Sequence, residues 1–201
     1  MNHSFIEKSC HKIGLITLAC LLSTAANAEW TLNSELSNLH FISIKKNTVG
    51  EVHHFKQLTG SLNDKNRATV TIPLNSVETL IPIRNERMQA VLFESQQFPL
   101  ATITTTLNAD AIKALASGAT TVQTLNLAVT LHGETQTYPG NIQITKLDSG
   151  TVMAATQTPI IVNAVDFKLL KGIEDLRELA GLPSIASAVP VTATLIFKQS
   201  K

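Results

Sequence analysis

The side chains that most often carry metal or acid–base chemistry are sparse in this sequence. Beyond residue 28, the 201-residue chain has four histidines, at His40, His53, His54 and His132. His53 and His54 are adjacent, so in a strand they would point to opposite faces and could not bind one metal ion together. No histidine pair has the i,i+2 strand spacing or the i,i+4 helix spacing of a metal site. We therefore expect structural or solvated histidines and no metal site.

Nucleophilic chemistry has no recognisable setting either. The chain lacks a Gly-x-Ser-x-Gly elbow, and both cysteines, Cys10 and Cys20, fall in the first 28 residues. The carboxylates of Glu174, Asp175 and Glu178 share one expected helix with Lys171 and Arg177, which is typical of a solvated helix face. We therefore expect no catalytic residues, no cofactor and no enzymatic activity.

One charged group stands close to apolar residues, namely Glu78, Arg84, Glu86 and Arg87. Two interpretations remain open for it. The group could mark the mouth of a cavity, or it could be the ordinary solvated side of a helix.

The composition excludes several other classes of protein. Lys and Arg number 16 against 15 Asp and Glu, a net charge of +1, whereas a nucleic-acid-binding protein concentrates uncompensated basic residues. Hydrophobic residues make up 44% of the chain and charged residues 15%, and the mean hydropathy is +0.15. These values argue against disorder and predict one folded domain.

The first 28 residues have the layout of a secretory signal peptide. Lys8 and Lys12 precede an apolar run from Ile13 to Leu22, and small residues follow it up to Ala28. Ten residues in a helix rise only about 15 Å, too short for a membrane span, so we expect no stable membrane anchor. Thr17 stands where a lipobox normally has Leu, which disfavours lipidation of Cys20. We predict cleavage after Ala28, release into the periplasm, and a cysteine-free mature domain of residues 29–201.

The elements of the mature chain are mainly strands with a period of two. Alternation is clear over 68–74, 125–131 and 189–197, and further strands are expected over 39–44, 49–57, 101–107, 137–147 and 152–162. Turn signals stand at Thr59-Gly60, Asn63-Asp64, His132-Gly133 and Ser149-Gly150. About eight mostly antiparallel strands suit a sandwich or a closed barrel, and we favour the barrel because it removes sheet edges.

Three short helices are expected between these strands, over 83–93, 109–116 and 171–179. Pro82 opens the first and Asn108 caps the second, while Gly181 and Pro183 end the third. In the first helix, Met88, Val91 and Leu92 can share one apolar face.

Several short motifs occur in an order that is similar to that of the YceI-like family. They are Trp30-Thr31-Leu32-Asn33 followed by Ser37, Leu39 and Phe41; Phe55 with Gly60; Ser76 to Thr79; Arg84 to Met88; Phe93; Phe98-Pro99; Leu131 to Gly133; and Asp166-Phe167. The resemblance implies an all-β, lipocalin-like, eight-stranded antiparallel barrel in the bacterial periplasm. It also implies a polyisoprenoid ligand, such as an isoprenoid quinone, along the lumen.

The polar part of the family pattern is altered here. Leu36, Lys45 and Arg87 occupy positions where the family tends to carry His, and Asn33 and Asn163 replace its Asp and Arg. These departures bear on which head group is recognised.

The leading hypothesis is a periplasmic protein that binds, transports or sequesters an isoprenoid lipid. We expect Arg84 and Arg87 near its head group, and a lumen lined by Phe41, Phe55, Val70, Ile72, Met88, Leu92, Phe93, Ile103, Leu127, Val129, Phe167, Val191 and Leu195. The alternative is a packed, non-catalytic barrel that acts as an interaction or stress-response module. Small inward residues, among candidates such as Ala68, Ala101, Ala128 and Ala193, would favour an open lumen. A homodimer is compatible with the sequence, which does not decide the oligomeric state.

Overall fold

The computed structural model describes Met1 and residues 30–199. The signal-peptide prediction and both cysteines therefore lie outside the described residues. The strands are β1 (Trp30–Leu32), β2 (Asn38–Lys45), β3 (Val49–Phe55), β4 (Thr59–Leu62), β5 (Arg67–Pro73), β6 (Val77–Glu78), β7 (Leu100–Thr106), β8 (Thr120–Leu131), β9 (Glu134–Asp148), β10 (Thr151–Thr156), β11 (Ile160–Asn163) and β12 (Ala188–Gln199).

Eight of these strands close into an antiparallel barrel in the order β1, β4, β5, β7, β8, β9, β10 and β12. The closing pair is β1 with β12, in which Trp30 is opposite Gln199 and Leu32 is opposite Phe197. The expected eight-stranded antiparallel barrel is confirmed. Closure pairs the backbone groups that an open sheet would leave exposed at its edges.

β12 holds the barrel together along its whole length. Near its C-terminal end it pairs with β1 and β10, and near its N-terminal end it pairs with β2 and β11. β2 continues into β3, which pairs with the short β6. These strands extend the barrel wall at one end only.

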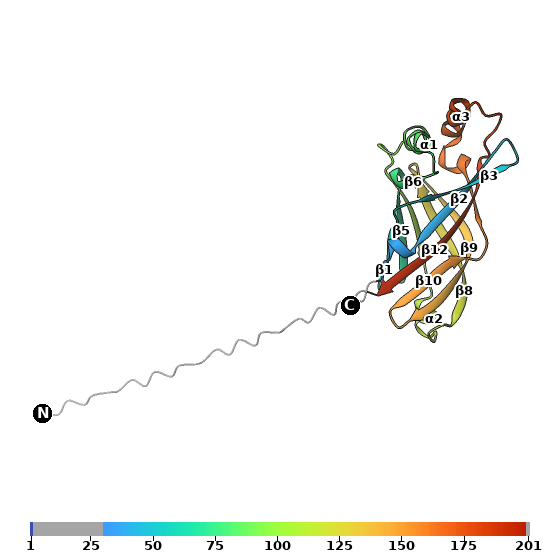
Figure 1. Ribbon diagram of the computed structural model, residues 1–201. Coiled ribbons are helices and arrows are strands. Elements are labelled where there is room, and N and C mark those ends of the chain that lie inside the picture. The colour runs from blue at the N-terminus through green and yellow to red at the C-terminus, as the bar shows by residue number, and fades with distance from the viewer. Residues whose placement is uncertain (2–29, 200–201) are drawn as a thin grey trace.

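Helices cover the two ends of the barrel (Figure 1). α1 and α3 lie side by side at one end, and α2 lies at the opposite end. We call these the α1–α3 end and the α2 end. The helices and helical turns are η1 (Ser34–Leu36), η2 (Leu74–Ser76), α1 (Pro82–Arg87), the π-helical η3 (Met88–Leu92), α2 (Ala109–Lys113), η4 (Ala164–Phe167) and α3 (Leu170–Leu179).

Local chemistry explains where these helices begin and how they pack. Pro82 occupies the first turn of α1, where its missing N–H has no partner to lose. The Asn108 side chain caps α2 by accepting a hydrogen bond from the Ala111 N–H at 3.1 Å. Gly172 lets α3 approach η3, because a Cβ there would lie 2.9 Å from the Leu92 Cα.

The structure corrects four details of the predicted elements. The strand expected over 152–162 is two strands, β10 and β11, because Pro159 has no N–H for a continuous ladder. Thr59-Gly60, expected in a turn, begins β4. The three-residue β1 was not expected, and the helix expected over 109–116 ends at Lys113. Within the described residues, no helix combines the length and the apolar character that a membrane span requires.

Candidate functional site

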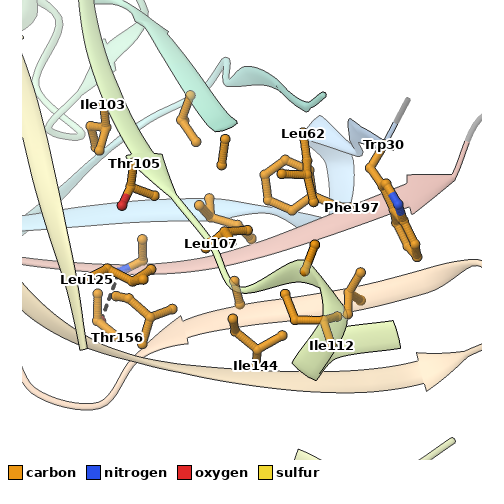
Figure 2. Close-up of a pocket in the computed structure, with 18 of the residues that line it drawn as sticks. Trp30, Leu62, Ile103, Thr105, Leu107, Ile112, Leu125, Ile144, Thr156 and Phe197 are labelled. Carbon is orange, nitrogen blue, oxygen red and sulfur yellow. Dashed lines mark hydrogen bonds between the residues drawn. The ribbon is translucent and has the colours of Figure 1, made fainter. Parts of the chain in front are cut away.

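The inward-facing side chains of the barrel enclose a cavity of about 350 Å³. Alternate residues of each strand point inward, as the period of two requires. Strand residues from opposite walls and Ile112 from α2 converge on this space (Figure 2). The lining is Trp30, Leu39, Leu62, Ala68, Val70, Ile103, Thr105, Leu107, Ala109, Ile112, Lys113, Leu125, Leu127, Ile142, Ile144, Lys146, Ser149, Val152, Ala154, Thr156, Ile160, Val191, Ala193, Leu195, Phe197 and Gln199.

Small residues on the inner face help to keep this space open. Ala68, Ala154 and Ala193 line it from three different strands. Of the other alanines considered from sequence, Ala101 is buried in the core and Ala128 is partly buried, and neither lines the cavity. Since a wall of Leu, Ile and Phe would fill an eight-stranded barrel, these small side chains favour an open lumen.

A second cavity of about 130 Å³ lies toward the α1–α3 end. Leu39 and Val191 line both cavities, so the two spaces follow one another along the barrel. Every residue of the second lining is apolar, namely Leu39, Phe41, Phe55, Leu92, Phe93, Leu131, Val162, Ala164, Phe167, Leu169, Ile173, Val189 and Val191.

The structure brings most of the expected lumen residues to these cavities. Those that line one or both are Phe41, Phe55, Val70, Leu92, Phe93, Ile103, Leu127, Phe167, Val191 and Leu195. Ile72 and Met88 are buried in the main core and line neither cavity. Val129 packs against the smaller cluster around Phe167.

The two arginines expected at a head group lie elsewhere. The Arg84 guanidinium donates to the Glu51 carboxylate at 2.7 Å and to the Thr79 carbonyl at 2.6 Å. Arg87 donates to the Leu179 carbonyl at 3.2 Å, which links α1 to the end of α3. Neither side chain lines a cavity, so a head-group role for them stays a prediction.

A polar cluster lies beyond the second cavity, between the β2–β3 hairpin and α1. The His53 ring is 3% exposed and its Nε2 is 2.8 Å from the Ser43 Oγ. The His53 Nδ1 and the Arg84 Nε are buried without a hydrogen-bond partner. Burial, together with the nearby positive charge of Arg84, lowers the pKa of His53 from 6.5 to about 4. The ring is therefore neutral at pH 7.

The other histidines have structural surroundings or no resolved role. His132 lies in the turn between β8 and β9, where its ring nitrogens are 2.7 Å from the Glu94 Oε2 and 3.2 Å from the Phe167 carbonyl oxygen. His40 and His54 are cross-strand neighbours whose rings lie 6.0 Å apart. Among the described residues, no group of three or more His, Cys, Asp or Glu side chains could hold a metal ion.

The sequence did not predict that residues at the α2 end help to line the larger cavity. Ile112 and Lys113 of α2 and Lys146 of β9 all line the larger cavity. The spacing of Ile142, Ile144 and Lys146 in the sequence could have indicated this. Residues two apart in a strand share a face, so Lys146 lies on the same inward face as the two isoleucines. Nothing in the sequence alone places α2 over the lumen.

A closed eight-stranded antiparallel barrel around two successive apolar cavities defines the class of small closed β-barrels to which lipocalin-like folds belong. The comparisons with known proteins narrow this class. The YceI-like domain matches residues 30–197. The chain belongs to the YceI-like family, which confirms the resemblance drawn from its motifs.

Solved structures share the fold at different distances. A polyisoprenoid binding domain from Saccharophagus degradans, implicated in plant cell wall breakdown, is 34% identical, with a TM-score of 0.84 over 85% of this chain and 98% of that chain. BcnA from Burkholderia cenocepacia is 16% identical, with a TM-score of 0.61 over 82% of this chain and 98% of its own. No curated protein matches the sequence.

Proposed function

We propose that this protein binds an isoprenoid lipid inside its barrel and transports or sequesters it in the periplasm. The observation that carries the proposal is the apolar cavity of about 350 Å³, followed by a second of about 130 Å³ toward the α1–α3 end. The succession of the two along the barrel suits a long, slender chain better than a compact ligand.

The Saccharophagus degradans domain supports the same chemistry. That protein is described as polyisoprenoid binding, and it is 34% identical to this chain over nearly its whole length. We extend its ligand class, an isoprenoid lipid, to this chain because the cavity is lined mainly by Leu, Ile, Val and Ala.

The free energy of burying an isoprenoid tail limits how the protein can select its ligand. A tail of about eight isoprene units has about 40 carbons, and at ~0.8 kcal/mol for each buried CH₂ its transfer from water would release ~30 kcal/mol. That exceeds the ~20 kcal/mol at which noncovalent affinities saturate. The true competitor is the membrane, where the tail is already dry. The net preference is therefore small, and selectivity depends on the length and shape of the lumen.

The periplasmic location rests on the signal-peptide pattern of the first 28 residues. We predict that secreted protein begins at Glu29. N-terminal sequencing of the exported chain tests this, and a chain that begins at a lipidated Cys20 would contradict it.

The alternative of a packed interaction or stress-response module is less well supported, because the cavity is large enough for a small-molecule ligand. We propose a non-catalytic binding protein without cofactor or intrinsic metal.

The direct test is native mass spectrometry of the protein purified from its own host. We expect a co-purified lipid with the mass of an isoprenoid. Delipidated protein should then take up isoprenoid quinones or prenols offered in vesicles. If it takes up none of them, the packed-barrel alternative replaces the carrier.

A further inference from the structure

The lumen is polar at one end only. Every residue that lines the smaller cavity is apolar, and none of them is exposed. In the larger cavity, Lys113, Ser149 and Gln199 line the α2 end and are exposed at the surface, and the partly buried Lys146 lies beside them. The larger cavity therefore reaches solvent at the α2 end, where its charged lining residues lie, while the lining toward the α1–α3 end is wholly apolar.

Lys146 places a positive charge on the inner face of the barrel. It follows Ile142 and Ile144 on the same face of β9. Its Nζ donates to the Lys113 carbonyl at 3.1 Å, at the last residue of α2, and to the Leu115 carbonyl at 2.8 Å, two residues further on. No ion pair between Lys146 and a carboxylate is found in the described part of the chain, so one of its three N–H donors is free for a ligand.

Lys113 adds a second ammonium group at the same opening. Its side chain is 73% exposed, and its nearest carboxylate, on Asp110, is 3.8 Å away and itself 91% exposed. Such a solvated pair holds its partners weakly. An anionic group at the opening could therefore replace Asp110 as the partner of Lys113.

From this arrangement we infer that the ligand lies with its apolar tail toward the α1–α3 end and an anionic head group at the α2 end, against Lys146 and Lys113. The chemical class is an isoprenoid with an oxyanion head, either a phosphate or a carboxylate. Charge-assisted hydrogen bonds from two ammonium groups recognise both. The inference rests on the proposed function and reverses the orientation expected from Arg84 and Arg87, which line neither cavity.

The test compares two ligands with the same tail, geranylgeranyl phosphate and geranylgeraniol. Trp30, the only tryptophan in the sequence, lines the cavity at the α2 end, so its fluorescence reports binding directly. In the wild-type protein we expect the phosphate to bind at least about tenfold more tightly than the alcohol, since one charge-assisted contact is worth that much. A geranylgeranoic acid arm distinguishes a carboxylate preference from a phosphate preference.

Single variants then locate the head group. Lys146→Met and Lys113→Met should each remove most of the preference for the phosphate, because each weakens binding of geranylgeranyl phosphate much more than binding of geranylgeraniol. Lys146 bonds to carbonyls at the end of α2, so its replacement could disturb that helix. Lys113 is exposed and its replacement should not affect folding, so the Lys113→Met protein tests the head-group site in either case. Lys171→Met, at the opposite end and 84% exposed, is the matched control and should keep the wild-type preference.

The outcomes separate the two proposals. Equal binding of the alcohol and the phosphate overturns the inference and leaves the carrier function standing. The inference is also overturned if Arg87→Met, rather than the lysine variants, removes the preference. Failure of both ligands to bind rejects the carrier function itself.

Discussion

His53 shows how a single side chain can be held neutral inside a barrel wall. Its ring is 3% exposed and packs 5.2 Å from the ring of Phe41, measured between centroids. The charged groups that face it are Arg84, Glu51 and Lys45, and the net effect of burial and charge is a pKa of about 4. The folded protein therefore takes up this proton less readily than the unfolded chain, whose histidine titrates near 6.5.

This difference predicts acid sensitivity. Above pH 6.5 both states are neutral at His53 and the group has no effect. Between pH 6.5 and pH 4 only the unfolded state gains the proton, so the free energy of unfolding should fall by up to about 3 kcal/mol. Urea denaturation at a series of pH values measures the loss.

The matched variants isolate that contribution. His53→Gln should flatten the pH profile over this range, because glutamine does not titrate. His54→Gln, next in sequence but on the opposite face of β3, should keep the wild-type slope. Parallel profiles for the wild type and His53→Gln would contradict the assignment.

At the scale of elements, α1 and η3 form one continuous helical segment that covers the α1–α3 end. Met88 is 6% exposed in the core, whereas Ile83 on the same segment is 53% exposed. Met88→Asp should lower the free energy of unfolding by about 3 kcal/mol or more, because it buries an unpaired charge.

Ile83→Asp is the control for this prediction and should change stability by less than about 0.5 kcal/mol. Thermal and urea unfolding of both variants provide the comparison. Wild-type stability of Met88→Asp would require the segment to lie elsewhere.

The contact of α3 with η3 depends on a glycine in a helix. Replacing a helical glycine by alanine normally stabilises a helix by about 1 kcal/mol. At Gly172 the new Cβ would lie 2.9 Å from both the Leu92 Cα and the Val91 carbonyl oxygen. We therefore expect Gly172→Ala to destabilise the protein by about 2 kcal/mol.

Gly150→Ala serves as the reference, since a Cβ there meets nothing closer than 3.9 Å. Its free energy of unfolding should stay close to that of the wild type. A gain in stability for Gly172→Ala would show that α3 is free to move away from η3.

The sequence predicted the long elements well because each has one buried and one outward face. Runs such as 125–131 and 189–197 alternate clearly and lie within β8 and β12. β1 and β4 have three and four residues, too few to establish a period, and they were missed. For the same reason, the strand residues expected in the lumen line a cavity except for Ile72 and Val129, although many further lining residues of the strands were not expected. The contribution of α2 was not identified, because it depends on tertiary placement of a five-residue helix.

At the scale of the whole molecule, a ligand inside the lumen would make lipid binding sensitive to which face of a strand is substituted. The same substitution should reduce lipid binding on the inward face and leave it unchanged on the outward face. Ala154 lines the larger cavity, and Ala155 points to the opposite face of β10. Ala154→Phe should abolish the co-purification of lipid and leave the barrel folded, because the new ring fills existing space.

The Ala155→Phe protein has the same amino-acid composition as the Ala154→Phe protein, but its new ring lies outside the lumen. It should therefore retain the lipid. Native mass spectrometry measures lipid content, and circular dichroism checks the fold. Equal lipid content in the two variants would contradict a ligand in the lumen.

The pairing of β12 has a consequence for the order in which the protein can be made and folded. This strand is the last one described, and it pairs with β1 and β2 from the start of the domain as well as with β10 and β11. Until residues 188–199 emerge from the ribosome, the first and last parts of the wall have no common partner. Such distant pairings form slowly because a long loop must close first. The barrel wall therefore cannot close until residues 188–199 have been synthesised, which would keep the chain unfolded for the export proposed above.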